Sequence, residues 1–367
     1  MKILWVPHTS RDSLGTKPRA LYFIERLAPR HTIHEFCWDA PVRRSVAGLA
    51  SALSFWRGAA DGVVRYHLPR LPTMPGTLGR TAVAVNQAIF RRLVRRVVRE
   101  GGIDVVICSC NWYVHGFPPP GLPVPLVLDY FDLLSEAHET RYFRDGQAVL
   151  CASSVMYERA RRHGVPCHHL PNGIDSHLFA RADGAPARRR YGLEGFRVVS
   201  LIGLTGSPRL YFLDAIELGS RRFPDLKGLI VGQGAMLPAI RAAIRGREHL
   251  FRLVGPQPYS AMPELFACTD VGLYPADQAP HFDAALPIKV LEYSAARKPV
   301  VAPPLEELRR LHFPNLRFAA PTAEAFAEAI GRALEEPVDR PDLSAFELAG
   351  LASRLESILA DVAGGRR

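Results

Sequence analysis

Short apolar runs alternate with amphipathic stretches along almost the whole chain. In the first half they predict strands at residues 3–6, 33–36, 104–108, 125–128 and 148–152, and helices at 17–28, 80–99 and 154–163. In the second half they predict strands at 198–202, 228–231, 251–254, 272–274, 300–302 and 317–319, and helices at 210–222, 235–245, 261–267, 288–297, 305–311 and 323–334. Such alternation is typical of parallel sheets with crossover helices, so we expect an α/β protein. Residues 42–79 show no clear period and receive no assignment.

A polar, aperiodic stretch divides the chain into two halves that share this pattern. With 367 residues there is room for two ordinary α/β domains. We expect a first domain at 1–179, a linker at 180–195 and a second domain at 196–338. The remaining residues, 339–367, hold a predicted helix with no strand after it. That helix is expected to cross back and pack on the first domain.

The net charge of the protein indicates which kinds of molecule it is expected to bind. The net charge of +10 favours anionic partners, namely phosphorylated substrates, nucleic acid or an anionic membrane face. No recognised nucleic-acid-binding module accompanies the charge, so nucleic acid is not expected. The sequence has no apolar run of about 18 residues that would span a membrane, and residues 1–7 are too short for a signal peptide. We therefore expect a cytoplasmic protein.

The cysteines give no sign of a metal site. None of the six forms a Cys-x-x-Cys pair, and most stand in or beside apolar runs. Buried free thiols in a reducing compartment are the simplest interpretation. We expect neither a metal ion nor a resident cofactor.

The segment 286–302 carries the strongest chemical signal. Pro287 suits the first turn of a helix, because a missing N–H does no harm there. Lys289 stands in that first turn, where a cation is unfavourable for the helix dipole unless an anion such as phosphate is nearby. Glu292, three residues on, shares its helix face and can accept hydrogen bonds from a ribose diol. An exposed Lys–Glu surface pair remains the alternative.

This segment resembles the Pro-x-Lys-x-x-Glu-Tyr-x-Ala signature of glycosyltransferases with the B-type fold, and residues 171–179 resemble their Pro-Asn-Gly-Ile-Asp-x-x-x-Phe element. The resemblance implies two Rossmann-like domains with an interdomain cleft and a nucleotide diphosphate sugar as donor. The acceptor would be a glycan, a lipid-linked saccharide or a small molecule. The donor-binding residues implied are Gly203, Arg209, Gly255, Tyr274, Asp283, Pro287, Ile288, Lys289 and Glu292. The implied acceptor contacts are Gly15 and Asn111.

The sequence also departs from the retaining members of that superfamily. They carry a second Glu eight residues before the helix Glu, where this chain has Ala284. The pattern is more similar to inverting, membrane-associated glucuronosyltransferases and to teichuronic-acid and capsule transferases, so inversion is slightly favoured for a hexosyl- or glucuronosyltransferase. An inverting displacement needs a base. Asp132, after a predicted strand, is the first choice and His8 the second. Asp132 could instead cap a helix.

Five arginines, at positions 91, 92, 95, 96 and 99, alternate with apolar residues on one predicted helix. The helix could lie on anionic lipid at the inner face of the plasma membrane, or pack on its own sheet with a solvated Arg face. Two other functions stay open, a nucleotide-sugar epimerase and a non-catalytic membrane-associated assembly protein. If Lys289 and Glu292 bind the donor, replacing either with Ala should weaken nucleotide binding and leave the melting temperature nearly unchanged.

Overall fold

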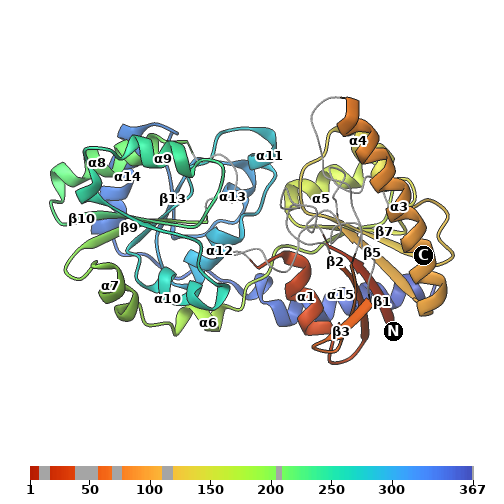
Figure 1. Ribbon diagram of the computed structural model, residues 1–367. Coiled ribbons are helices and arrows are strands. Elements are labelled where there is room, and N and C mark those ends of the chain that lie inside the picture. The colour runs from red at the N-terminus through yellow and green to blue at the C-terminus, as the bar shows by residue number, and fades with distance from the viewer. Residues whose placement is uncertain (8–16, 38–56, 68–76, 110–118, 204–208, 366–367) are drawn as a thin grey trace. The chain divides into compact units, whose positions relative to one another are not determined.

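The computed structural model describes residues 1–7, 17–37, 57–67, 77–109, 119–203 and 209–365. The chain divides into two compact units. Within the described residues, unit 1 runs from Met1 to Pro171 and resumes at Leu348, and unit 2 spans Asn172–Glu347. Each unit is a sheet with helices, as the alternating pattern predicted (Figure 1).

Unit 1 is built on an eight-stranded sheet in the order β3-β4-β2-β1-β5-β6-β7-β8. All neighbouring strands pair in parallel except β3, which is antiparallel to β4. The strands are β1 (Lys2–Val6), β2 (Thr32–Cys37), β3 (Arg57–Ala60), β4 (Val63–His67), β5 (Val105–Ser109), β6 (Leu126–Tyr130), β7 (Ala148–Cys151) and β8 (Cys167–His169). The helices are α1 (Arg19–Leu27), α3 (Thr77–Gly101), α4 (Glu136–Phe143), α5 (Ser154–Arg161) and α15 (Leu348–Ala363).

The last helix, α15, belongs to unit 1 and packs beside α1 (Figure 1). Its buried residues Leu351, Leu355 and Leu359 recur every fourth position, so they form one apolar stripe. That stripe lies in the same core as Phe23 of α1 and the strand residues of the sheet. At the polar side, Glu356 pairs with Arg30 and His31 in the turn after α1.

Unit 2 is a six-stranded, fully parallel sheet in the order β11-β10-β9-β12-β13-β14. Its strands are β9 (Arg197–Ile202), β10 (Leu226–Val231), β11 (Phe251–Val254), β12 (Val271–Leu273), β13 (Val300–Ala302) and β14 (Leu316–Phe318). Its helices are α6 (Ser176–Ala180), α7 (Ala185–Tyr191), α8 (Tyr211–Arg222), α9 (Leu237–Ala243), α10 (Met262–Ala267), α11 (Pro280–Asp283), α12 (Ile288–Ala295), α13 (Glu306–Arg310) and α14 (Ala323–Glu335). The strand order changes direction between β9 and β12. In open α/β sheets, ligands bind at such a point, outside the carboxyl ends of the strands.

The expected linker at 180–195 is instead a folded part of unit 2. It contains α7, whose Ala187 is fully buried, as is Leu193 just after the helix. A Cβ at Gly184 would lie 2.4 Å from the backbone nitrogen of Cys268, so this position needs glycine. Of the arginines that made the stretch look like a linker, Arg189 and Arg190 are exposed on α7, whereas Arg188 is half-buried and pairs with Asp270.

Residues 42–79, left without assignment, include the hairpin β3–β4. The strands are joined by Asp61 and Gly62, both at positive φ (51° and 73°). Asp-Gly is the favoured pair for a two-residue hairpin turn, because both positions there need positive φ. The signal was present in the sequence, but β3 is short and exposed and so lacks an apolar alternation.

Candidate functional site

The first turn of α12 brings Lys289 and Glu292 together at the carboxyl edge of the unit 2 sheet. Lys289 Nζ lies 2.9 Å from Glu292 Oε2, and the two side chains are 15% and 0% exposed. Burial raises the pKa of Glu292, and the neighbouring Lys289 ammonium and Tyr259 hydroxyl oppose that rise. The alternative of an exposed surface pair is therefore wrong, because this carboxylate is entirely withdrawn from solvent.

The end of β9 lies directly against this pair. Gly203 follows β9 with a φ of +89°, and its N–H donates to the carbonyl of Val231 at 2.8 Å. A Cβ on Gly203 would lie 2.9 Å from Cε of Lys289. Glycine is favoured here by its backbone conformation, and a larger residue would also displace the end of the lysine side chain. The structure brings Gly203, Lys289 and Glu292 into one cluster beside the point where β9 and β12 part.

Four other residues that the resemblance implies lie at strand ends or at the start of α12. Pro287 precedes α12 and Ile288 opens it. Tyr274 follows β12, and burial raises the pKa of its hydroxyl, which stays neutral and able to donate. Gly255 follows β11, and a Cβ there would have open space around it.

Two of the nominated residues are engaged elsewhere. Arg209 donates from Nε to Asp277 Oδ1 at 2.5 Å, and its side chain is 61% exposed. Asp283, in α11, accepts a hydrogen bond from the N–H of Glu306 at 3.3 Å, where α13 begins. Asp283 therefore caps a neighbouring helix. Asp283 stands next to Ala284, where retaining members carry their second Glu, but its carboxylate bonds to the N–H of Glu306 and not to Lys289.

In unit 1, Asp132 lies just beyond the carboxyl end of β6 and is exposed. Its Oδ1 accepts a hydrogen bond from the N–H of Leu133 at 3.0 Å. Helix α4 begins at Glu136 with Ser135 as its cap residue, so the interpretation of Asp132 as the cap of that helix is wrong. His8, Gly15 and Asn111 lie outside the described residues.

A buried charge network at the carboxyl edge of unit 1 was not among the predicted site residues. Asp129 is 1% exposed, lies 2.9 Å from Nε of Arg19 and accepts from Ser109 Oγ at 3.0 Å. Arg19 also donates to the carbonyls of Leu170 and Pro171, the last residues of unit 1 before the chain enters unit 2. The sequence signal for this network was Asp129, a charged residue within the apolar run of β6. Because burying an unpaired charge is costly, such a residue predicts a buried partner.

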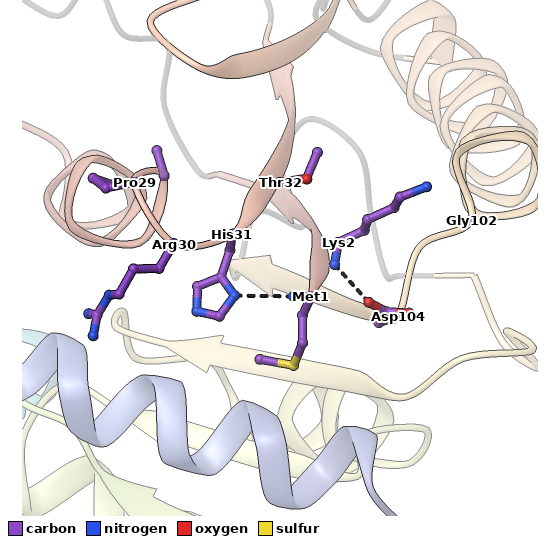
Figure 2. Close-up of a pocket in the computed structure, with 9 residues that line it drawn as sticks. Met1, Lys2, Pro29, Arg30, His31, Thr32, Gly102 and Asp104 are labelled. Atoms are coloured by element: carbon purple, nitrogen blue, oxygen red, sulfur yellow. Dashed lines mark hydrogen bonds between the residues drawn. The ribbon is translucent and has the colours of Figure 1, made fainter.

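A solvent-facing hollow of about 660 Å³ lies at the opposite, amino end of β1 and β2 (Figure 2). Figure 2 shows the amino group of Met1 against His31 Nδ1 (3.3 Å) and the N–H of Lys2 donating to Asp104 (2.7 Å). These groups satisfy one another. Because open α/β sheets bind ligands at the carboxyl ends of their strands, we do not assign this hollow as the site.

The comparisons bear on the cluster in unit 2. Residues 207–336 match the family model described as Glycosyl transferases group 1. This match covers about a third of the chain, all of it in the unit 2 part of the sequence. The matched segment contains α12 with Lys289 and Glu292, and it begins just after Gly203.

Two curated relatives agree with the glycosyltransferase match. A Bacillus subtilis protein named as a teichuronic acid biosynthesis glycosyltransferase, TuaH, is 28% identical over 190 residues, or 48% of this chain and 45% of that protein. A phosphatidyl-myo-inositol mannosyltransferase of Mycobacterium tuberculosis is 33% identical over 201 residues, or 53% and 46%. The chain thus matches about half the length of these relatives.

Solved structures agree with the fold over the whole chain. Sucrose-phosphate synthase from Thermosynechococcus elongatus superposes with a TM-score of 0.73 at 13% identity, covering 100% of both chains. Anabaena HepE in complex with UDP and glucose gives a TM-score of 0.66 at 18% identity, covering 98% of this chain and 100% of that one. The expected fold, two Rossmann-like domains of the glycosyltransferase B type, is confirmed.

The basic helix α3 packs on its own sheet. Phe90, Val94, Val97 and Val98 are buried, and the rings of Phe90 and Phe36 meet edge to face at 6.4 Å. The exposed arginines are Arg92, Arg95, Arg96 and Arg99. Arg91 is half-buried, and burial lowers its pKa. The described part of α3 therefore offers a charged face without a free apolar one.

Three further expectations concern features of the whole chain. Among the described residues, no cluster of three or more His, Cys, Asp and Glu side chains could hold a metal ion. The cysteines within those ranges (Cys37, Cys108, Cys151, Cys167 and Cys268) carry free thiols. In the same ranges, no helix combines the length and apolarity needed to cross a membrane.

Proposed function

We propose that this chain transfers a glycosyl unit from a nucleotide diphosphate sugar to an acceptor hydroxyl. The observation that carries the proposal is the buried Lys289–Glu292 pair against Gly203, inside the group 1 glycosyltransferase segment. The carboxylate of Glu292 would accept hydrogen bonds from the ribose diol. Lys289 and the free N–H groups at the start of α12 would hold the diphosphate.

The polar groups of this pair suit a ligand that carries both hydroxyl donors and an anionic group. Beyond the Lys289 ammonium at 2.9 Å, this buried carboxyl group needs hydrogen-bond donors, because neither oxygen of Glu292 has a well-directed hydrogen bond among the described residues. Two ribose hydroxyls would supply such donors. Once they do, more of the Lys289 charge can act on the diphosphate, which gains negative charge as it leaves.

The reaction we propose is a single inverting displacement. The acceptor oxygen forms a bond to the anomeric carbon while the bond from that carbon to the diphosphate breaks. The acceptor proton passes to the carboxylate of Asp132, which is exposed at the carboxyl edge of the unit 1 sheet. The diphosphate leaves with the electron pair, and Lys289 and the α12 N-terminus compensate its charge, so we propose that no divalent metal is needed.

The donor and acceptor classes are inferred from the relatives. Because HepE is described with UDP and glucose, a UDP-hexose or UDP-glucuronate is the first donor to try. The names of the curated relatives concern teichuronic acid and phosphatidyl-myo-inositol. We propose a cell-surface polysaccharide or glycolipid acceptor at the cytoplasmic face of the plasma membrane, with the arginines of α3 drawing the protein to anionic lipid.

A thermal-shift screen with UDP, GDP, dTDP and CDP sugars tests the donor, because a ligand at 100 times its Kd adds roughly 2.7 kcal/mol to stability. Turnover with the stabilising donor and lipid-linked or saccharide acceptors then tests transfer. Conversion of the donor sugar without an acceptor would indicate an epimerase. Binding without conversion in any combination would indicate an assembly protein. No stabilisation by any of the nucleotides would reject the donor site.

A further inference from the structure

A buried tyrosine, Tyr293 of α12, fills the place where β9 and β12 part. Its hydroxyl donates to the carbonyl of Ser200 at 2.9 Å and accepts from the N–H of Ile202 at 3.2 Å. Its ring lies on Gly272 of β12, where a Cβ would be 2.6 Å from the ring carbons. The ring also meets Phe266 edge to face at 4.6 Å. No part of this tyrosine reaches solvent.

The Tyr293 hydroxyl makes hydrogen bonds to β9 that a neighbouring strand would otherwise make. On one side, β9 pairs with β10 along its whole length, up to Ile202 opposite Val231. On the other side, β12 pairs with β9 only opposite Val199 and Ser200. The backbone groups of Ser200 and Ile202 on that side would otherwise be buried without a neighbouring strand, at a cost comparable to a lost hydrogen bond for each.

Further hydroxyls hold the tyrosine in one orientation. Ser200 Oγ lies 2.9 Å from the Tyr293 hydroxyl and 2.8 Å from Thr269 Oγ1, and Thr269 Oγ1 donates to the carbonyl of Leu265 at 3.1 Å. All three hydroxyl residues are buried. This chain of hydrogen bonds ties α12, β9 and the end of α10 together.

We infer that Tyr293 is a positioning residue for the donor site, an inference that rests on the proposed function. Tyr293 is adjacent to Glu292, and its hydroxyl fixes α12 to Ser200 and Ile202, the last part of β9 before Gly203. Lys289 packs on that glycine. The tyrosine thereby sets how the Lys289–Glu292 pair lies against the end of β9, beside which the ribose and diphosphate would bind.

The test is Tyr293→Phe, which keeps the ring on Gly272 and Phe266 and removes only the hydroxyl. We expect Kd for UDP, or for whichever of GDP, dTDP and CDP the wild type binds, to rise by at least about fivefold, the lower end of what a lost buried hydrogen bond can produce. We also expect amide hydrogen exchange at Ile202 to accelerate, since its acceptor is gone. Calorimetry and residue-resolved exchange measure the two effects.

The matched control is Tyr142→Phe in unit 1. That tyrosine is also buried, and its hydroxyl donates to a strand carbonyl, that of Cys108, at 2.7 Å. It should lose comparable stability and keep wild-type nucleotide affinity. If Tyr293→Phe loses stability but binds nucleotide as tightly as wild type, the positioning role is refuted while the proposed function stands. If the wild type itself binds none of the four nucleotides, the proposed function fails, and this inference with it.

Discussion

Replacing Lys289 with Ala tests whether α12 holds a buried, ionised carboxylate. The sequence pattern alone suggested that this change would leave the melting temperature nearly unchanged. The structure reverses that expectation, because Glu292 is 0% exposed and lies 2.9 Å from the lysine ammonium. Removing the cation leaves the carboxylate buried without its ion-pair partner.

The expected loss can be worked out from this geometry. Two unit charges 2.9 Å apart attract by roughly 6 kcal/mol at an effective dielectric constant of about 20, much of which the desolvation of both groups offsets. Breaking a buried pair by removing one partner typically costs about 3–5 kcal/mol. Since Lys289 is 15% exposed, we take the lower end, about 3 kcal/mol. For a unit of this size that is a fall of roughly 6–12 °C in melting temperature.

The loss should also depend on pH. Burial already raises the pKa of Glu292, and Lys289 opposes the rise, so its removal moves that pKa further up. A carboxyl whose folded pKa lies above its unfolded value destabilises the fold once ionised. The additional loss of folding stability caused by Lys289→Ala is therefore absent at pH values below the pKa of Glu292 in the folded wild type. It grows as pH rises above that value and is complete above the folded pKa in the variant.

Thermal unfolding between pH 5 and 8 measures this, with calorimetric UDP affinity alongside. Adding Glu292→Gln to Lys289→Ala removes the stranded charge and should recover most of the stability, but not the nucleotide binding. Arg332→Ala, which breaks the exposed Arg332–Glu328 pair of α14, is the control and should change neither quantity. A Lys289→Ala protein that melts like wild type throughout this pH range would refute the buried ion pair.

Four further outcomes follow. Asp132→Asn should cut turnover by about two orders of magnitude or more with donor affinity retained and EDTA without effect, and full turnover would end its assignment as the base. Arg19→Ala should cost about 3–5 kcal/mol in urea unfolding, because it strands Asp129, whose side chain is 2% exposed; a neutral effect would contradict the buried network. Gly203→Ala should abolish detectable nucleotide binding, because position 203 has a φ of +89° and contacts Lys289. Wild-type affinity in this variant would show that the site has been assigned wrongly. Replacing Arg92, Arg95, Arg96 and Arg99 with Gln should reduce sedimentation with anionic vesicles, as should added salt; equal sedimentation of wild type with neutral vesicles would reject the electrostatic association.

Much of the fold could be predicted from local pattern. All six strands of unit 2 and five of unit 1 were expected near their observed places, because buried parallel strands form continuous apolar runs between turns. The three strands of unit 1 that escaped lack a long apolar run. Strand β3 is exposed, β4 is interrupted by Arg65, and β8 is three residues long. Helix α7 escaped because it has one buried residue among arginines.

The sequence by itself determined the chemistry that was available: a first-turn lysine, a glutamate on the same helix face, and a glycine after a strand. It could not decide their surroundings, because burial depends on segments far apart in the chain. Only the tertiary structure shows that Glu292 is withdrawn from water, that Arg209 and Asp283 are held by other partners, and that Tyr293 stands in for a strand. The hydrogen bonds of Tyr293 reach residues 93 and 91 positions away, and the ion pair of Asp129 with Arg19 spans 110. The hydrophobic periodicity of a single segment carries no information about such contacts, because they form only when the sheet assembles.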